Sequence, residues 1–107
     1  MQLPDFALVE FDWDPGNRDK CEAHGLTREE VERLFRGSVL VLDDPAHSMV
    51  ERRFQAIGRT ADGRFAFIVF TLRECDGRTL VRPVSARYMH RKEIARHERQ
   101  APAHPDH

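Results

Sequence analysis

The sequence lacks the features that mark membrane proteins, secreted proteins and disulfide-stabilised proteins. Its 107 residues include 2 cysteines, Cys21 and Cys75, which form no CxxC pair. The longest uncharged apolar run, residues 65–72, is far shorter than the roughly 20 residues that span a bilayer. The N-terminal segment carries Asp5 and Glu10 but no basic residue, unlike a secretory signal. We therefore expect a cytoplasmic protein with reduced thiols and no membrane partner.

Motifs for several kinds of catalysis are also missing. The chain has no glycine-rich phosphate loop and no GxSxG, which argues against nucleotide hydrolysis and α/β-hydrolase chemistry. It has no HExxH, and its 6 histidines, at positions 24, 47, 90, 97, 104 and 107, form no close cluster with other ligand types. The sequence therefore predicts neither a metal site nor another cofactor.

What is present fits one domain, expected over residues 1–100, with a flexible tail at residues 101–107. Two helices are expected early in the chain, at residues 18–24 and after the capping box that begins at Thr27. The other expected elements are strands at residues 7–12, 39–42, 53–60, 64–73 and 79–86, and a helix at residues 89–100. This order predicts an α+β fold, an antiparallel meander sheet packed against two N-terminal helices and a C-terminal helix.

Two Asp-Gly steps, at residues 62–63 and 76–77, indicate hairpins between the later strands. Residues 65–70 are apolar on both faces of their strand, so we expect this strand to be central and covered on both sides.

Charge is distributed unevenly along the chain. Residues 1–51 contain 5 basic and 12 acidic side chains, whereas residues 52–107 contain 12 basic and 6 acidic ones. Eleven of those 12 basic residues are arginines, whose planar fork matches phosphate. The pattern favours a surface for a polyanion. The competing interpretation is that the two halves neutralise each other across the fold.

Strand alternation places Arg53 and Arg59 on one face of their strand. Arg82 and Arg87 lie on opposite faces of a regular strand, but a bulge near Pro83 would bring them to the same face. The four arginines would then line one surface, as a phosphate-binding site requires. The alternative is four solvated surface side chains.

Two further residues are candidates for site chemistry. His24 is expected at a helix C-terminus, where the helix dipole favours the protonated imidazole, although a simple capping role also fits. Trp13 follows the first expected strand in a loop, where its indole is placed either to stack on a base or to pack on the core.

Four segments resemble the BrnT toxin family in order and spacing. They are residues 11–14 (Phe-Asp-Trp-Asp), 20–27, 51–60 and 82–87, and the last, Arg-x-x-Ser-Ala-Arg followed by a helix, is the most specific. The resemblance covers about residues 6–98. It implies a RelE-like ribonuclease fold and a toxin of a type II toxin-antitoxin pair. It also implies an RNA substrate, inhibition of translation and neutralisation by BrnA, a ribbon-helix-helix antitoxin.

Cleavage of RNA without a metal needs a base, an acid and cations that stabilise the charged phosphorane. On the function that the resemblance implies, we expect Arg53, Arg82 and Arg87 to hold the phosphate. His24 is the first candidate for either the acid or the base, and Glu51 is a second candidate base. The substrate-binding candidates are Lys20, Trp13 and Arg59.

The chain departs from the family pattern at Ala23, where a lysine commonly precedes the histidine. Lys20 lies one helical turn before His24 and is placed to take part of that role. The alternative function is therefore a non-catalytic RNA- or protein-binding module of the same fold. In either case we expect DNA contacts to be made only through the antitoxin. The expected complex of this chain with its antitoxin is a heterotetramer.

Overall fold

Five strands and three helices make up residues 3–44 and 51–100, the part of the chain that this computed structural model describes. The elements are β1 (Glu10–Phe11), α1 (Pro15–Glu22), α2 (Arg28–Arg36), β2 (Val39–Asp43), β3 (Phe54–Arg59), β4 (Phe65–Cys75), β5 (Arg78–Tyr88) and α3 (Arg91–Gln100). None of the described helices is long and apolar enough to cross a membrane. The expected tail at residues 101–107 lies outside the described residues.

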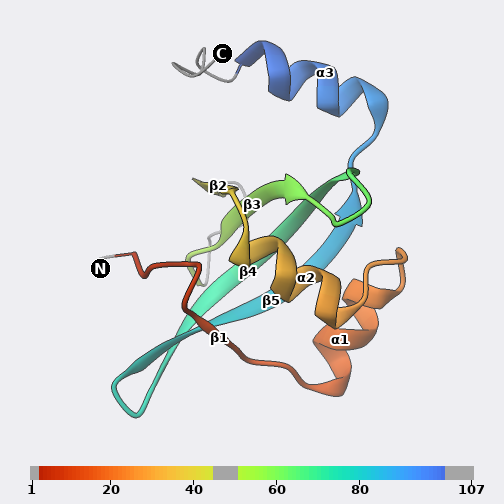
Figure 1. Ribbon diagram of the computed structural model, residues 1–107. Coiled ribbons are helices and arrows are strands. Elements are labelled where there is room, and N and C mark those ends of the chain that lie inside the picture. Colours follow the sequence, from red (N-terminus) through yellow and green to blue (C-terminus); the bar gives the residue numbers. More distant parts are fainter. Residues whose placement is uncertain (1–2, 45–50, 101–107) are drawn as a thin grey trace.

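The strands form one sheet in the order β1-β5-β4-β3-β2 (Figure 1). The predicted antiparallel meander is confirmed for β2 to β5. The prediction of a wholly antiparallel sheet is wrong, because β1 pairs parallel to β5, with Glu10 opposite Leu80. This pairing joins segments about 70 residues apart, and no local signal in the sequence sets its direction. The fold is therefore α+β with a mixed five-stranded sheet.

The positions of the helix ends are set by side chains that form hydrogen bonds with the free backbone groups there. Asp14 accepts a hydrogen bond from the Asn17 backbone N–H, and Pro15 fits the first helical position, so α1 begins three residues earlier than predicted. It ends at Glu22, which leaves His24 in the following turn rather than in the helix. The capping box predicted at Thr27 is confirmed by reciprocal bonds with Glu30.

One face of the sheet packs against α1 and α2, which lie together on that side (Figure 1). The centre of this core is Phe70, whose ring contacts Phe6, Phe35 and Phe54 at centroid distances of 5.2–5.7 Å. At Gly58 a Cβ atom would lie 3.0 Å from Leu34, so the glycine lets α2 approach β3 closely.

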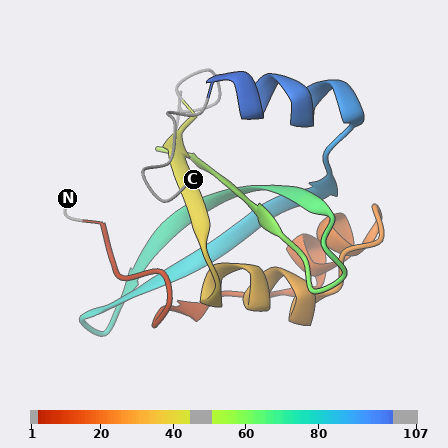
Figure 2. The ribbon, with the colours of Figure 1, turned by 45° about the horizontal axis from the view of Figure 1, so that its top comes forward.

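The opposite face, which we call the open face, has no helix packed directly onto its strands. Phe65, Phe67 and Val69 of β4 point to this face and are half-buried. The guanidinium groups of Arg59 and Arg87 lie over the Phe65 and Phe67 rings, at 4.5 and 5.0 Å from the centroids. The helix α3 lies on this side and stands away from the sheet (Figure 2). We expected β4 to be covered on both faces. The cover is complete on the face that packs against α1 and α2, and it is partial on the open face.

Candidate active site on the open face of the sheet

A β-bulge in β5 decides which arginines share the open face. Ser85 lies opposite Val69 and Pro83 lies opposite Phe70, so Val84 is the extra residue. Beyond the bulge the strand has reversed its alternation, and Arg82 and Arg87 both point to the open face. The bulge predicted near Pro83 is therefore confirmed. Arg53 and Arg59 belong to the same face through the pairing of β3 with β4.

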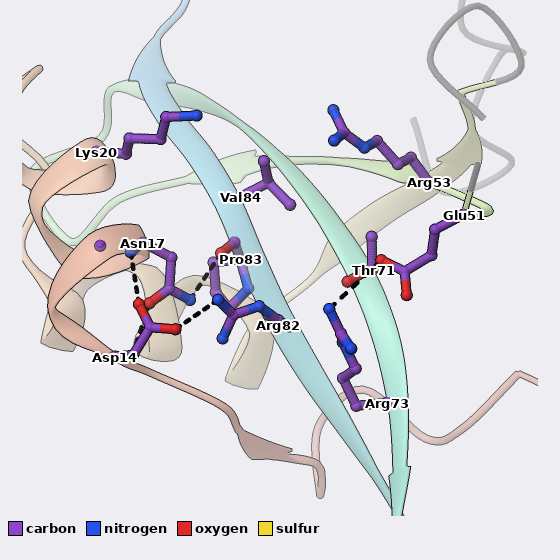
Figure 3. A pocket seen from close by; sticks show the side chains of 11 residues that line it. Asp14, Asn17, Lys20, Glu51, Arg53, Thr71, Arg73, Arg82, Pro83 and Val84 are labelled. Carbon is purple, nitrogen blue, oxygen red and sulfur yellow. Dashed lines mark hydrogen bonds and ion pairs between the residues drawn. The ribbon is translucent and has the colours of Figure 1, made fainter. Parts of the chain in front are cut away.

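Between α1 and the open face lies a cleft of about 370 Å³, which we call the Arg82 cleft (Figure 3). Four of its lining residues are cations and two are carboxylates, so the cleft is positive overall. It is lined by Asp14, Gly16, Asn17 and Lys20 of α1 and its cap, Glu51 and Arg53 before β3, Thr71 and Arg73 of β4, and Arg82, Pro83 and Val84 of β5. The structure thus brings together Lys20, Glu51, Arg53 and Arg82 of the predicted site residues.

Two carboxylates at the N-terminus of α1 hold the side chain of Arg82. Its guanidinium group lies 2.5 Å from Asp14 Oδ2 and 3.3 Å from Asp12 Oδ2. The two carboxylate oxygens of Asp14 have different partners. Oδ1 accepts a hydrogen bond from the backbone N–H of Asn17 in the first turn of α1, and Oδ2 accepts one from Arg82. The Asn17 backbone N–H, and after it Arg82, lower the pKa of Asp14, and Asp14 raises the pKa of Arg82. Arg82 therefore remains a fixed cation at the cleft.

Asn17 fastens α1 to the bulged part of β5. Its side-chain amide donates to the carbonyl oxygens of Asp12, at 2.9 Å, and Pro83, at 2.8 Å. The side chain is buried, so both hydrogen bonds are protected from water. Lys20, one turn further along α1, lines the same cleft as Val84 and Arg82 (Figure 3).

Ion pairs also join the acidic and basic halves of the chain, as the competing interpretation of the charge pattern predicts. These pairs include Arg52 with Asp43, Arg73 with Glu51, Arg78 with Glu10, and Arg82 with Asp12 and Asp14. Most of these side chains are half exposed, so each pair contributes little to stability. The two interpretations are compatible, since the cleft keeps a cationic excess.

Arg87 and Arg59 lie further along the open face, outside the Arg82 cleft. Arg87 forms a two-pronged ion pair with Glu93, both distances being 2.7 Å, and Glu93 also accepts the His90 backbone N–H at 2.9 Å. Arg87 therefore anchors the start of α3 to the sheet. Arg59 borders a separate hollow of about 500 Å³ beside β2, formed largely by Val39, Leu40, Ile57 and Phe65.

The Arg87 ion pair predicts a dependence of stability on pH. Arg87 and the His90 N–H lower the pKa of Glu93 to about 2, against an ordinary value of 4.5. A depressed pKa stabilises the fold above pH 4.5, and the contribution is lost as the pH falls from about 4.5 to 2. In urea unfolding, Glu93→Gln should be less stable than the parent at pH 7, and this difference should shrink below pH 4.5. Glu98→Gln, an exposed change on the same helix, is the control. A difference that is constant from pH 7 to pH 3 would contradict the ion pair.

Two more predicted site residues, in addition to Arg59 and Arg87, lie away from the cleft lining. Trp13 packs against the core, and its Nε1 donates to Glu32 at 2.8 Å. His24 is exposed in the turn after α1, next to Gly25, whose φ of 92° lets the chain reverse. His24 comes four residues after Lys20, outside the helix.

The described residues contain no group of three His, Cys, Asp or Glu side chains arranged to hold a metal ion. His47, His104 and His107 lie outside the described residues. Both cysteines are free, and burial raises the pKa of the Cys21 thiol to about 11, which makes that thiol a poor nucleophile.

Comparison with known proteins decides the family. The model of the family described as "Ribonuclease toxin, BrnT, of type II toxin-antitoxin system" matches residues 13–93. The chain belongs to the BrnT family. No curated protein matches the chain. The BrnT match spans all residues that line the Arg82 cleft, as well as the Arg87 to Glu93 ion pair.

Membership of the BrnT family makes the chain a ribonuclease toxin with an RNA substrate and an antitoxin partner. The cleft has the charge that an RNA phosphate requires, and its arginines stand on strands and beside a helix anchored by Asn17. Four residues that line this cleft were not among the predicted site residues: Asp14, Asn17, Thr71 and Arg73. Strand alternation would have placed Thr71 and Arg73 on the face of Arg82, but only once the pairing of β4 with β5 was known.

Proposed function

We propose that the chain is an endoribonuclease toxin that cleaves RNA in the Arg82 cleft without a metal ion and so inhibits translation in the cytoplasm. The observation that supports this proposal is the convergence of Lys20, Arg53 and Arg82 with the carboxylate of Glu51 around one hollow. We further propose that residues 1–100 form one toxin domain, a variant of the RelE-like ribonuclease fold.

The proposed chemistry is an internal transfer of the phosphodiester. The 2′-hydroxyl oxygen of the RNA attacks the adjacent phosphorus, its proton passes to a base, and the bond from phosphorus to the 5′-oxygen breaks. An acid then protonates the departing 5′-oxygen, which leaves a 2′,3′-cyclic phosphate and a 5′-hydroxyl end. Arg53 and Arg82 stabilise the charge that develops on the phosphorane oxygens, where a preorganised cation is most effective.

Within the cleft, Glu51 is the candidate base. Its carboxylate faces Arg73 at 3.6 Å and its side chain is about half exposed, so it is accessible to a substrate. Lys20 is the nearest cation contributed by α1 and is the candidate acid at the leaving oxygen. His24 is the competing candidate for the acid, because it is an exposed imidazole in the turn that directly follows α1. Arg87 and Arg59 extend the cationic face for neighbouring phosphates of the RNA chain.

A cleavage assay tests the chemistry. We expect purified protein to cleave single-stranded RNA in excess chelator and to leave cyclic phosphate ends, identified by phosphatase and kinase treatment. Glu51→Gln removes the base while keeping its shape, and should lower the rate by about 100-fold. Glu74→Gln on β4, outside the cleft, is the matched control. Parallel assays of Lys20→Ala and His24→Ala decide which residue is the acid.

Two outcomes would contradict the proposal. Cleavage that stops in chelator and resumes with a divalent ion would refute metal-independent chemistry. RNA binding without cleavage, combined with no growth arrest on induction in cells, would instead support the alternative of a non-catalytic binding module.

For the antitoxin we propose a BrnA-like ribbon-helix-helix protein that forms a heterotetramer with this chain and makes the DNA contacts itself. The acidic N-terminal half supports this proposal, because a DNA-binding partner carries basic segments that an acidic surface attracts. The mass of the co-purified complex, measured by light scattering, tests the stoichiometry.

A further inference from the structure

The hydroxyl group of Thr71 is buried in the Arg82 cleft without a hydrogen-bond partner. Thr71 is 1% exposed, and its Oγ1 is the one buried side-chain polar atom of the described residues that lacks a partner. Leaving a buried hydroxyl unpaired is costly, and most such groups are paired in native proteins. An unpaired hydroxyl in the lining of a cationic cleft indicates a ligand that the chain itself does not supply.

Thr71 occupies the middle of a row of side chains across the open face. It lies opposite Arg82 in the pairing of β4 with β5. On its other side, the pairing of Phe54 with Phe70 places Arg53 next to it. Neighbouring strands are about 4.8 Å apart, so the backbones of Arg53 and Arg82 are about 10 Å apart with Thr71 between them. At that separation two long guanidinium side chains can close on one phosphate.

The cations around Thr71 are occupied by carboxylates that a phosphate can replace. Asp14 holds Arg82, and Glu51 holds Arg73 at 3.6 Å (Figure 3). The side chains of Asp14, Glu51 and Arg73 are each about half exposed, and ion pairs at such positions are weak. An RNA phosphodiester offers these arginines two non-bridging oxygens and the same single negative charge as a carboxylate, so it can take the carboxylate's place. A phosphate that takes the place of these carboxylates lies over Thr71.

We propose that Thr71 is a phosphate-binding residue, whose Oγ1–H donates a hydrogen bond to a non-bridging oxygen of the RNA phosphate between Arg53 and Arg82. This inference rests on the proposed function of the cleft and adds a neutral, rigid ligand to its cations. A β-branched side chain on a central strand has few rotamers, so Thr71 fixes the direction from which the phosphate is held. The arginines supply charge, and Thr71 supplies position.

The test measures free-protein stability and phosphate binding in the same variants. Thr71→Val replaces the hydroxyl with a methyl group of similar shape, and Thr71→Ser restores the hydroxyl. Thr79→Val is the matched control, since Thr79 also lies in the sheet but donates to Glu74 outside the cleft. Binding is followed by fluorescence anisotropy with a short 2′-fluoro RNA, which cannot be cleaved, and inorganic phosphate is used as competitor.

We expect Thr71→Val to melt a few degrees higher than the parent, because it no longer buries an unpaired hydroxyl. We expect the same variant to bind the RNA probe about tenfold or more weakly, because it loses a hydrogen bond to a charged group. Thr71→Ser should recover most of the affinity, and Thr79→Val should bind like the parent. Inorganic phosphate should displace the probe from the parent at lower concentration than it does from Thr71→Val.

Three results would overturn the inference. Unchanged affinity in Thr71→Val would show that the hydroxyl does not touch phosphate, and if Arg82→Ala still lost binding and cleavage, the proposed function would stand without it. Weaker binding accompanied by a lower melting temperature would assign Thr71 a structural role only. A parent protein that neither binds the probe nor cleaves RNA would refute the inference together with the proposed function.

Discussion

Replacing Arg82 with alanine should lower the rate of RNA cleavage by on the order of 100-fold or more. Arg82 is the cation at the centre of the cleft, and the carboxylates of Asp12 and Asp14 hold it in place before substrate arrives. A cation that is already positioned stabilises the developing negative charge without having to reorganise during the reaction. Initial rates on a single-stranded RNA, at one fixed salt concentration and in excess chelator, measure the effect.

The matched control is Arg78→Ala, which removes an arginine from the same strand outside the cleft, where Arg78 pairs with Glu10. It should cleave at nearly the parent rate. Arg82→Lys keeps the charge but loses the two-pronged geometry, so its rate should fall between the parent and Arg82→Ala. If Arg82→Ala cleaves at full rate while remaining folded, the reaction occurs elsewhere on the open face, and Arg87 becomes the first residue to test.

The largest effect on stability should come from Phe70→Ala. Phe70 is fully buried at the centre of an aromatic cluster, in contact with Phe6, Phe35 and Phe54. Truncation to alanine removes most of these contacts and leaves a cavity, which should lower the free energy of unfolding by about 3–5 kcal/mol. Urea unfolding at pH 7 measures the change. Such a loss is a large part of the total stability expected for a domain of this size.

Leu8→Ala is the control for Phe70→Ala, because Leu8 is 78% exposed and its removal should change stability by less than about 0.5 kcal/mol. A change below about 1 kcal/mol in Phe70→Ala would mean that the core closes around the missing ring. Because Phe70 adjoins the bulge and Thr71, the variant should also lose cleavage activity at temperatures where it is still folded.

Features of the fold that depend on neighbouring residues were predictable from the sequence. The Thr27 capping box needs only a hydroxyl and a glutamate three residues later. The turn between β4 and β5 needs two residues with positive φ, which Asp76 and Gly77 supply at 52° and 77°. The bulge near Pro83 follows from the missing N–H of proline, which cannot take part in a regular ladder.

Features that depend on distant residues were not predictable in the same way. The parallel pairing of β1 with β5 is set by how the whole chain packs, and two residues of strand carry no pattern that reveals it. The choice of Trp13 between stacking on a base and packing on the core was open in the sequence. The structure places its indole against the core because Glu32, on α2, offers Nε1 an acceptor.

The residue types of the candidate site were predictable from the sequence, but which of these residues lie close together was not. The face shared by Arg53 and Arg82 follows from strand alternation and the registers of the two hairpins, and the bulge adds Arg87 to that face. Their separation from Arg87 does not, since it depends on Glu93 at the start of α3. Thr71 was hidden within an apolar run, where a threonine is usual, and only its lack of a partner in three dimensions distinguishes it.

The divided carboxylate of Asp14 has a consequence for how substrate enters. Oδ1 of Asp14 caps the N-terminus of α1, and Oδ2 accepts a hydrogen bond from Arg82. A phosphate that replaces Oδ2 as the partner of Arg82 therefore leaves the helix cap intact. Binding and release of substrate therefore do not disturb α1, although Asp14 takes part in both. On the proposed function, Asp14 is a substitute anion that keeps Arg82 in place while no RNA is bound.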